Sequence, residues 1–206
     1  GEYSDLLTRE TAQQMTGRGP RARLVEMKGV GHAPTFMHAD QIAEMVGMDV
    51  DSLGLRLRFW KGSHFVMRGW HGMINRLIYP APQKNTVGIH TTTDLAGEIH
   101  LGPSAAHLPG RIFDYTVDLA QREDFWKAVC TFLPALQLES LEPGMAGIRP
   151  TFHKPGEPRK DFRVCHEADL GFPGFINVMG IDSPGLTASP AIGRYVASLV
   201  EEVVGN

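Results

Sequence analysis

Short runs rich in Val, Ile, Phe and Tyr fill residues 55–103, and the segments between them carry Gly, Pro and Asn. This spacing is typical of antiparallel strands joined by turns. Elsewhere in the chain, three more strands are expected at 145–152, 162–166 and 175–179, and helices at 118–133 and 186–204. The pattern predicts an α+β fold, in which a mainly antiparallel sheet of about six to eight strands carries helices on one face.

Residues 1–46 follow a different pattern, that of a short N-terminal αβα piece. A helix is expected from Ser4 or Asp5 to Met15, a strand at 22–27 and a second helix at 39–46. A single strand has no partner inside this piece, and a piece of about 40–60 residues buries little apolar surface alone. We therefore expect it to dock onto the rest of the chain or onto another subunit.

Charge and cysteine content exclude several classes of protein. The 20 basic and 23 acidic residues give a net charge of −3, which offers no attraction for nucleic acid or an anionic membrane. No apolar run approaches the roughly 18 residues of a membrane span, and no secretory signal is visible at the N-terminus. Two cysteines, Cys130 and Cys165, are too few for a disulfide framework. We therefore expect a cytoplasmic protein with reduced thiols and no nucleic-acid or membrane partner.

The strongest local signal is a strand that leads through a turn into a helix at 175–195. The apolar run ends at Gly180, Ser183 is expected to cap the helix, and Pro184 suits its first position. Gly185 keeps this helix end free of side chains. Such an N-terminus carries partial positive charge and favours an anion or an electron-rich carbonyl. The pattern alone favours an ordinary capped strand-turn-helix over such a binding site.

A family resemblance rests on five motifs that occur in a fixed order. They are KGSHF at 61–65, RLIYP at 76–80, GIHTT at 88–92, GIRP at 147–150 and GIDSPGLTA at 180–188. Together, residues 47–204 resemble the C-terminal half of the FAD-dependent L-2-hydroxyglutarate dehydrogenases and oxidases, relatives of the D-amino-acid oxidase group. The resemblance implies FAD as cofactor and a small-molecule carboxylate as substrate.

The resemblance also implies roles for individual residues. His90 would be the base that takes the substrate hydroxyl proton, and Arg149 and Lys61 would contact substrate carboxylates or flavin. From the residues alone, His90 is also compatible with a cross-strand hydrogen bond and Lys61 with a solvated charge. The family usually has an aromatic hydroxyl where His64 stands and often a Lys where Thr151 stands. The flavin pyrimidine carbonyl would lie near Gly180, Ile181, Asp182, Ser183, Pro184, Gly185, Leu186 and Thr187.

The phosphate-binding fingerprint of that family is missing from this chain. G-x-G-x-x-G should lie between an apolar strand and a helix. The nearest match, at 17–22, follows a polar helix and contains the helix breaker Pro20. We therefore expect weak FAD binding and little or no flavin activity from the chain itself.

Residues 1–46 have a resemblance of their own, to the C-terminal end of an α/β-hydrolase. His32, in GVGHAP, stands where those enzymes carry the catalytic histidine. The chemistry needs a serine nucleophile on a G-x-S-x-G turn, which the chain lacks. The sequence therefore predicts two parts, an α/β-hydrolase-like fragment at 1–46 and an oxidoreductase-like substrate domain at 47–206, joined as an apparent chimera.

Two alternative functions remain open from the sequence. One is an esterase-type hydrolase that uses His32 or a site of histidines and carboxylates, for which His90 and His100 are expected to meet across a hairpin with Asp94 and Glu98 nearby. No established metal-ligand spacing occurs among the nine histidines, so we predict no metal. The other is a non-catalytic chimera that forms a homo-oligomer through uncovered sheet edges.

Overall fold

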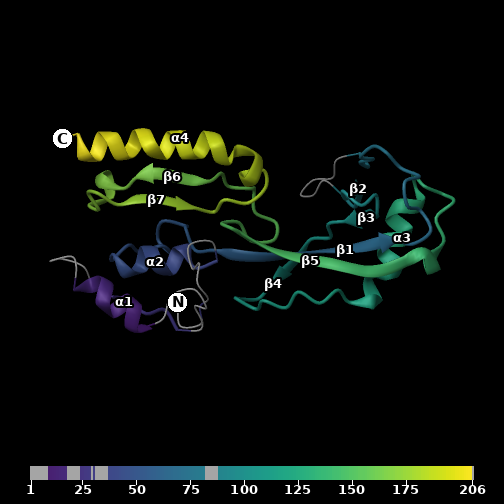
Figure 1. Ribbon diagram of the computed structural model, residues 1–206, viewed down its shortest axis with the longest axis horizontal. Helices are drawn as coiled ribbons and strands as arrows, with labels where there is room; N and C mark the ends of the chain where they lie inside the picture. The colour runs from purple at the N-terminus through teal and green to yellow at the C-terminus, as the bar shows by residue number, and fades with distance from the viewer. Residues whose placement is uncertain (1–8, 18–23, 29, 31–36, 82–87, 206) are drawn as a thin grey trace. The chain divides into compact units, whose positions relative to one another are not determined.

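The computed structural model describes residues 1–206 except 1–8, 18–23, 29, 31–36, 82–87 and 206 (Figure 1). The chain forms two compact units: one joins residues 1–57 to 161–206, and the other comprises residues 58–160. Each contains helices and antiparallel strands, which confirms the predicted α+β class. These unit boundaries differ from the boundary between residues 46 and 47 that the sequence predicts. The different origin of residues 1–46 stays a prediction.

The unit of residues 58–160 is built on a five-stranded antiparallel sheet whose centre is the long strand β1, Arg58–Met67. Strand β5, Leu141–Thr151, pairs along one side of β1. The other side is shared by β3, Ile99–Gly102, and β4, Ala106–Leu108, and β2, His90–Thr93, extends the sheet beyond β3 (Figure 1).

A bulge in β5 lies opposite His64. Ser63 pairs with Ala146, but Phe65 pairs with Pro143, so β5 contains one more residue than β1 over this interval. An extra residue twists the strands locally and redirects nearby side chains, and such bulges are frequent next to functional sites.

The two faces of this sheet differ because successive side chains of a strand point to opposite sides. One face carries Phe65 and Met67 of β1 with Leu101 of β3, and helix α3, Arg122–Cys130, packs against it. The Phe65 and Phe125 rings lie 4.8 Å apart. The opposite face carries Trp60, Gly62 and His64 of β1, together with Gly147 and Arg149 of β5.

The other unit contains helices α1, α2 and α4 and a two-stranded antiparallel sheet. The helix bounds are Arg9–Thr16, Ala39–Met45 and Gly185–Val204, and the strands are β6, Arg163–His166, and β7, Ile176–Met179.

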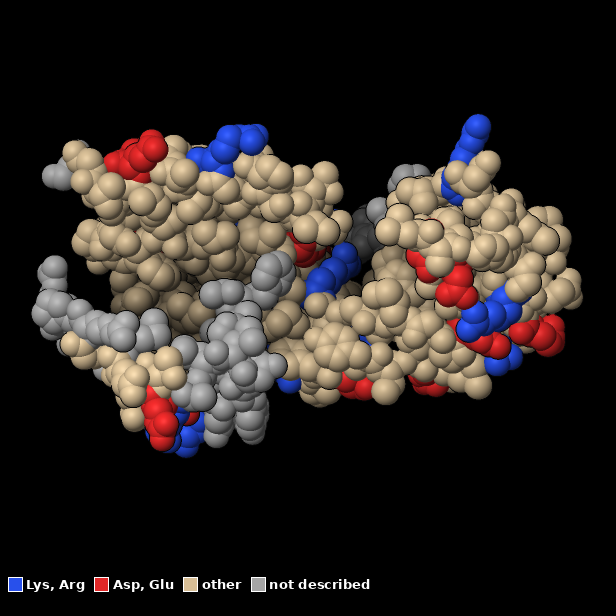
Figure 2. All heavy atoms as spheres, in the orientation of Figure 1, with Lys and Arg blue, Asp and Glu red and all other residues tan. Residues whose placement is uncertain are grey.

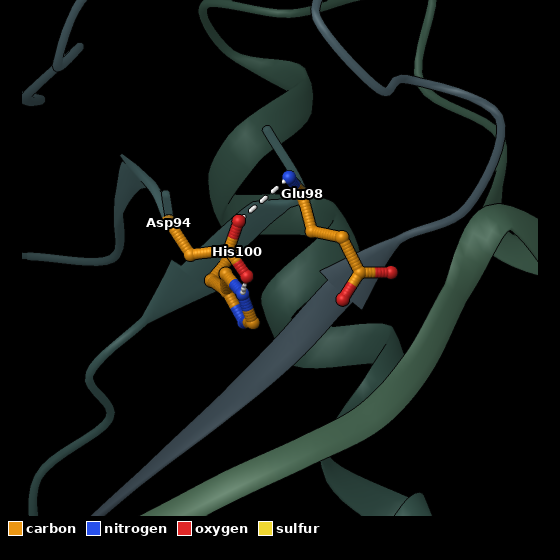
Figure 3. A group of neighbouring side chains, drawn as sticks. All are labelled: Asp94, Glu98 and His100. Atoms are coloured by element: carbon orange, nitrogen blue, oxygen red, sulfur yellow. Dashed lines mark hydrogen bonds and ion pairs between the residues drawn. The ribbon is translucent and has the colours of Figure 1, made fainter. Parts of the chain in front are cut away.

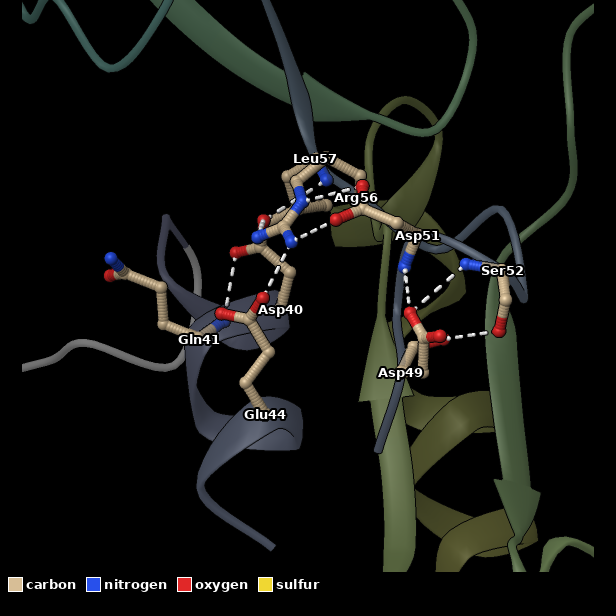
Figure 4. Close-up of polar contacts among 8 residues, drawn as sticks. All are labelled: Asp40, Gln41, Glu44, Asp49, Asp51, Ser52, Arg56 and Leu57. Atoms are coloured by element: carbon tan, nitrogen blue, oxygen red, sulfur yellow. Dashed lines mark hydrogen bonds and ion pairs between the residues drawn. The ribbon is translucent and has the colours of Figure 1, made fainter. Parts of the chain in front are cut away.

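Arg56 ties α2 to the segment that follows it (Figure 4). Its guanidinium lies 2.5 Å from carboxylate oxygens of Glu44 and Asp51 and 3.6 Å from buried Asp40. Hydrogen bonds from Arg56 to Asp51 and Glu44 raise the Arg56 pKa above its usual range. Asp40 also accepts the Leu57 backbone N–H at 3.2 Å, so this cluster fixes the chain path.

A buried carboxylate ties the end of β6 to β7. Glu167 is 1% exposed, forms an ion pair with Arg163 and accepts a 2.9 Å hydrogen bond from Asn177. Burial opposes ionisation of Glu167, but the hydrogen bonds from Arg163 and Asn177 outweigh burial and lower its pKa.

Several expected elements differ from those observed. Residues 24–27, the described part of the strand expected at 22–27, have no regular structure, and no strand among the described residues pairs with them. Residues 58–62 and 64–67 of the runs at 55–62 and 64–69 form one strand, β1, rather than two. Residues 76–81 are not a strand, although Ile78 exchanges hydrogen bonds with Thr91. Strand β4 was not expected. The helix expected at 39–46 is confirmed as α2.

The described surface has mixed charge. On the face drawn in Figure 2, described Lys and Arg side chains alternate with Asp and Glu, and no large patch of one sign forms. Within the described ranges, no helix combines the length and apolar character needed to cross a bilayer.

Candidate functional site

A cavity of about 210 Å³ opens on the sheet face opposite α3, and all of its lining residues belong to the unit of residues 58–160. Strand β1 contributes Trp60, Gly62 and His64, and β5 contributes residues 147–149. Pro103 and Ser104, which follow β3, complete the lining. The Ser104 backbone N–H donates to the Ser63 carbonyl, and the Ser104 hydroxyl accepts the Ser63 N–H, both at 3.0 Å.

Two paired glycines leave space in this cavity. Gly62 lies opposite Gly147 in the β1–β5 pairing. A Cβ atom at Gly62 would lie 2.8 Å from the Pro103 Cβ, so a side chain there would displace the Pro103 segment. A Cβ atom at Gly147 would meet nothing within 4 Å, so a side chain there would project into open space. Because neither glycine carries a side chain, the space between the cavity walls stays open at this point.

Trp60 forms a fixed wall beside Arg149, its cross-strand partner on β5. The indole stacks on His153 with centroids 5.7 Å apart and meets His107 edge-on at 5.2 Å. Its Nε1–H donates to the His153 carbonyl at 3.4 Å. Arg149 is half-buried and lines the same cavity, so this wall carries one permanently charged side chain beside an aromatic ring.

His64 is the second titratable group on the cavity wall. Its ring lies against Gly102, whose φ of +155° and lack of a side chain make room for it. Burial lowers the His64 pKa, and the nearby rings of His100 and His90 lower it further. A hydrogen bond with the Met145 backbone, in the bulge, acts in the opposite direction and raises the His64 pKa.

His90, the expected base, is buried on β2 and is not among the residues that line the cavity. Its ring stacks on Tyr79 with centroids 4.0 Å apart, and its Nδ1 lies 3.0 Å from the Gly88 carbonyl oxygen. Because a carbonyl only accepts, this contact assigns the proton to Nδ1 and leaves the Nε2 lone pair basic.

Lys61 lies on the opposite face of β1 from Trp60 and does not line the cavity. Its Nζ lies 3.1 Å from the Asp114 carboxylate. Hydrogen bonds from the Thr116 N–H and hydroxyl, together with the hydrogen bond and charge of Lys61, lower the pKa of Asp114 to about 2. The structure therefore brings Arg149, but not Lys61, to the cavity.

The segment Gly180–Thr187 belongs to the other unit and links β7 to α4. Gly180 has a φ of +70°, and the Gly185 N–H donates to the Asp182 carbonyl at 2.6 Å. A side chain at Gly185 would overlap Ile181. The helix begins at Gly185 after the N-cap residue Pro184. The expected Ser183 cap was wrong, because the N-cap residue is Pro184 and no side-chain cap bond forms.

Pro190 interrupts the hydrogen-bond pattern of α4 without ending the helix. Proline has no N–H to donate to the Leu186 carbonyl. The Ser189 hydroxyl donates to that carbonyl instead, at 2.8 Å.

A second cavity, of about 310 Å³, lies in the same unit as α4. It is lined by Ala39 and Ile42 of α2 and by residues 175–181. None of these lining residues carries a charge or a titratable side chain, so this cavity offers an apolar surface but no group for acid–base chemistry.

The carboxylates expected near His100 do gather there (Figure 3). Ligand atoms of Asp94, Glu98 and His100 lie within 4.8 Å of one another. Asp94 accepts the backbone N–H groups of Ala96 and Glu98, both at 2.9 Å, and Glu98 pairs with Arg68 at 2.6 Å. These contacts stabilise the β2–β3 hairpin, and they account for the cluster without an ion. His90 does not join it, because His90 pairs with Gly102 and Thr92 pairs with His100.

The sequence analysis did not assign Trp60 or Gly147 to a functional site, and it considered His64 only as a difference from the family's usual residue. The available signal was alternation along the strand. Trp60, Gly62 and His64 repeat with period two, and so do Gly147 and Arg149. His32 lies outside the described residues.

Comparison with known proteins identifies the family to which this chain belongs. The family model described as FAD dependent oxidoreductase matches residues 37–199. The chain is 33% identical over 197 residues to the mitochondrial L-2-hydroxyglutarate dehydrogenase of Arabidopsis thaliana, covering 85% of this chain and 41% of that protein. The FAD-bound L-α-glycerophosphate oxidase of Mycoplasma pneumoniae shares the fold, with a TM-score of 0.61 at 22% identity. That similarity covers 80% of this chain and 40% of the oxidase.

A shorter similarity concerns a different class of enzyme. Over 43 residues, 21% of this chain, the sequence is 54% identical to the 3-hydroxybutyrate-oligomer hydrolase of Cupriavidus necator. This stretch covers 15% of that hydrolase, which is too little to assign a fold or an activity. The hydrolase fragment and the chimera therefore remain predictions.

Proposed function

Because the chain belongs to the family of FAD-dependent oxidoreductases, we propose that it contributes the substrate site of a flavin-dependent 2-hydroxy-acid dehydrogenase or oxidase. The observation that carries the proposal is the placement of Arg149 on the wall of the cavity above Gly147. A guanidinium binds a carboxylate through two parallel hydrogen bonds. The cavity of about 210 Å³ suits a molecule of a few carbons rather than a drug-sized ligand.

The FAD site proposed for this family member includes the N-terminus of α4. Gly185 is buried and its N–H is bonded to the Asp182 carbonyl, whereas Leu186, the next residue of the first turn, is 91% exposed. N–H groups in a first helical turn lack carbonyl partners within the helix and attract electron-rich groups. Residues 180–187 therefore fit one edge of a flavin. When bound, FAD supplies a hydride acceptor.

The chain spans about two fifths of the relatives it matches, and it has no G-x-G-x-x-G between a strand and a helix. We therefore propose that these residues complete a flavin site rather than form one. Low FAD affinity is expected for the chain alone.

His90 remains the proposed proton acceptor for the substrate hydroxyl. The Gly88 carbonyl holds the Nδ1 proton and the Tyr79 ring holds the plane of the imidazole, so Nε2 is the basic atom. Because His90 does not line the cavity, the substrate hydroxyl must either reach its Nε2 directly or pass the proton to it through a water molecule. Lys61, paired with Asp114, is proposed to support β1 rather than to bind substrate.

Equilibrium binding tests this function without requiring turnover. L-2-Hydroxyglutarate and glycerol 3-phosphate are titrated separately into the purified chain, and Trp60 fluorescence is the readout, with Trp60→Phe to identify its signal. We expect saturable quenching by the hydroxy acid that is lost in Arg149→Gln. Equal quenching of the wild type and Arg149→Gln, or preference for the phosphate, would overturn the assignment. A parallel titration with FAD tests the flavin site.

A second candidate, ester hydrolysis through His32, is favoured by the 43-residue similarity to a hydrolase. Esterase activity is compared in the wild type, in His32→Ala and with a chelator present. Activity that survives both changes would eliminate this candidate.

A further inference from the structure

Helix α4 carries two apolar stripes that run side by side along its length, one against the strands and one on the outside. The inner stripe faces β6 and β7 (Figure 1), and its members are buried or half-buried: Gly185, Ala188, Ile192, Val196, Leu199 and Val203. The outer stripe is displaced by one residue and comprises Leu186, Pro190, Gly193, Ala197, Val200 and Val204. All six residues of the outer stripe are exposed.

The outer stripe is a continuous surface rather than a set of scattered residues. Its members recur every three or four positions, which places them on one side of a helix over about 27 Å. Leu186 and Val204, at its two ends, are 91% and 75% exposed. Single exposed apolar residues need no explanation, but a contiguous exposed set marks an interaction surface.

Two charged residues border the outer stripe on the side away from the inner stripe. At 3.6 residues per turn, Arg194 and Glu201 lie about 60–80° round the helix from the centre of the outer stripe. They are two turns apart along this flank, and neither has an opposite charge three or four positions away in α4. When two helices pack antiparallel about a two-fold axis, equivalent flanks meet. The cation of each helix is then complementary to the anion of the other.

We propose that α4 is the interface of a homodimer, in which two copies of this helix pack antiparallel along their outer stripes. A two-fold axis at Ala197 brings Arg194 of each copy opposite Glu201 of the partner subunit. The charge pattern therefore selects a second copy of this chain as the occupant of the stripe. This inference is independent of the proposed function, because it uses no residue of the substrate cavity.

The same register also matches the apolar side chains of the two copies. Val200 of one copy lies over Gly193 of the partner subunit, and a Cβ atom at Gly193 would meet nothing within 4 Å in its own chain. Val204 lies beside Pro190 of the partner subunit. Leu186 extends past the overlap, so the first turn of α4 stays accessible in the dimer.

The size and symmetry of this interface determine the kind of assembly expected. A two-fold interface uses the same surface on both copies, so assembly stops at the dimer. A single helix pair is at the low end of interface size, and we therefore expect a Kd of about 10–100 µM.

Sedimentation equilibrium of the purified chain, over concentrations that span this Kd, tests the interface. Ala197→Glu brings two like charges together at the two-fold axis and should weaken the dimer at least about tenfold. Ala191→Glu is the matched control, because Ala191 is exposed on α4 but lies outside the outer stripe, and its dimer Kd should match the wild type. A monomeric wild type, or equal weakening by the two variants, would overturn the proposal.

Charge reversal tests the antiparallel arrangement. Arg194→Glu and Glu201→Arg should each weaken the dimer about fivefold, because each opposes two like charges across the interface. The double variant reverses both charges and restores both ion pairs, so its Kd should return to within about twofold of the wild type. A double variant that dimerises no more tightly than the single variants would overturn the antiparallel pairing.

Discussion

The two faces of the five-stranded sheet share the same strands but use alternate residues for different purposes. On one face, Phe65 and Leu101 are fully buried and pack with Phe125 of α3. On the other, Trp60, His64 and Arg149 surround a cavity whose floor is a pair of glycines. Adjacent residues of β1 have different roles because successive side chains of a strand point to opposite faces of the sheet. Lys61 and Trp60 therefore cannot contribute to the same site.

The largest expected effect is a difference in unfolding free energy between variants on the two faces of the sheet. Phe65→Ala should lower the free energy of unfolding by about 3–5 kcal/mol, because it leaves a cavity in the packed face. The neighbouring His64→Gln should change it by no more than about 0.5–1 kcal/mol. Urea denaturation monitored by circular dichroism measures both. Similar losses in the two variants would break the division between a structural and a binding face.

Arg149 should have a smaller effect on stability but a clear effect on binding. Arg149→Gln should weaken carboxylate binding by about 10–100-fold, since a hydrogen bond to a charged group contributes about 1.5–3 kcal/mol. Lys61→Gln, on the opposite face, is the matched control and should leave the Kd unchanged. Calorimetric titration measures both Kd values. A larger loss of affinity in Lys61→Gln than in Arg149→Gln would place the binding site on the opposite face of the sheet.

Gly147 tests whether the empty space itself matters. Gly147→Val should fill the floor of the cavity and weaken ligand binding by about tenfold or more, while stability stays within about 1 kcal/mol because the position faces open space. Gly110→Ala, also beside open space but outside the cavity lining, is the control. Unchanged ligand affinity in Gly147→Val would place the ligand elsewhere.

The smallest effect concerns Asp114, the partner of Lys61. Its pKa, lowered from 3.8 to about 2, should rise in both Thr116→Val and Lys61→Met, because each variant removes a hydrogen bond to this carboxylate. Both variants keep the Thr116 N–H, so neither should reach 3.8. Carboxyl-carbon NMR titration measures the pKa values. An unchanged Asp114 pKa in either variant would contradict the role of that hydrogen bond.

The sign of the pH effect at Asp114 follows from the direction of its shift. A carboxyl whose pKa is lower in the folded state stabilises the fold above about pH 4, and this contribution is lost as the pH falls towards about 2.

The strand pattern predicted the α+β class, and the apolar run at 175–179 with its following glycine predicted the β7–α4 connection, because these signals are local. Residues 24–27 failed as a strand because strand formation depends on a partner that local sequence does not specify. The cavity depends on register. Only the pairing of Trp60 with Arg149 and of Gly62 with Gly147 brings distant segments together, and the bulge opposite His64 has no sequence signature.

The most direct test of the central claim, that this sheet face binds a small carboxylate, is an amide NMR titration of the chain with glutarate. The account predicts saturable shift changes at residues 60–64, 104 and 147–149, with little change at Phe125 and Val129 of α3. Shift changes confined to the helix-covered face, or none at saturating ligand, would contradict it.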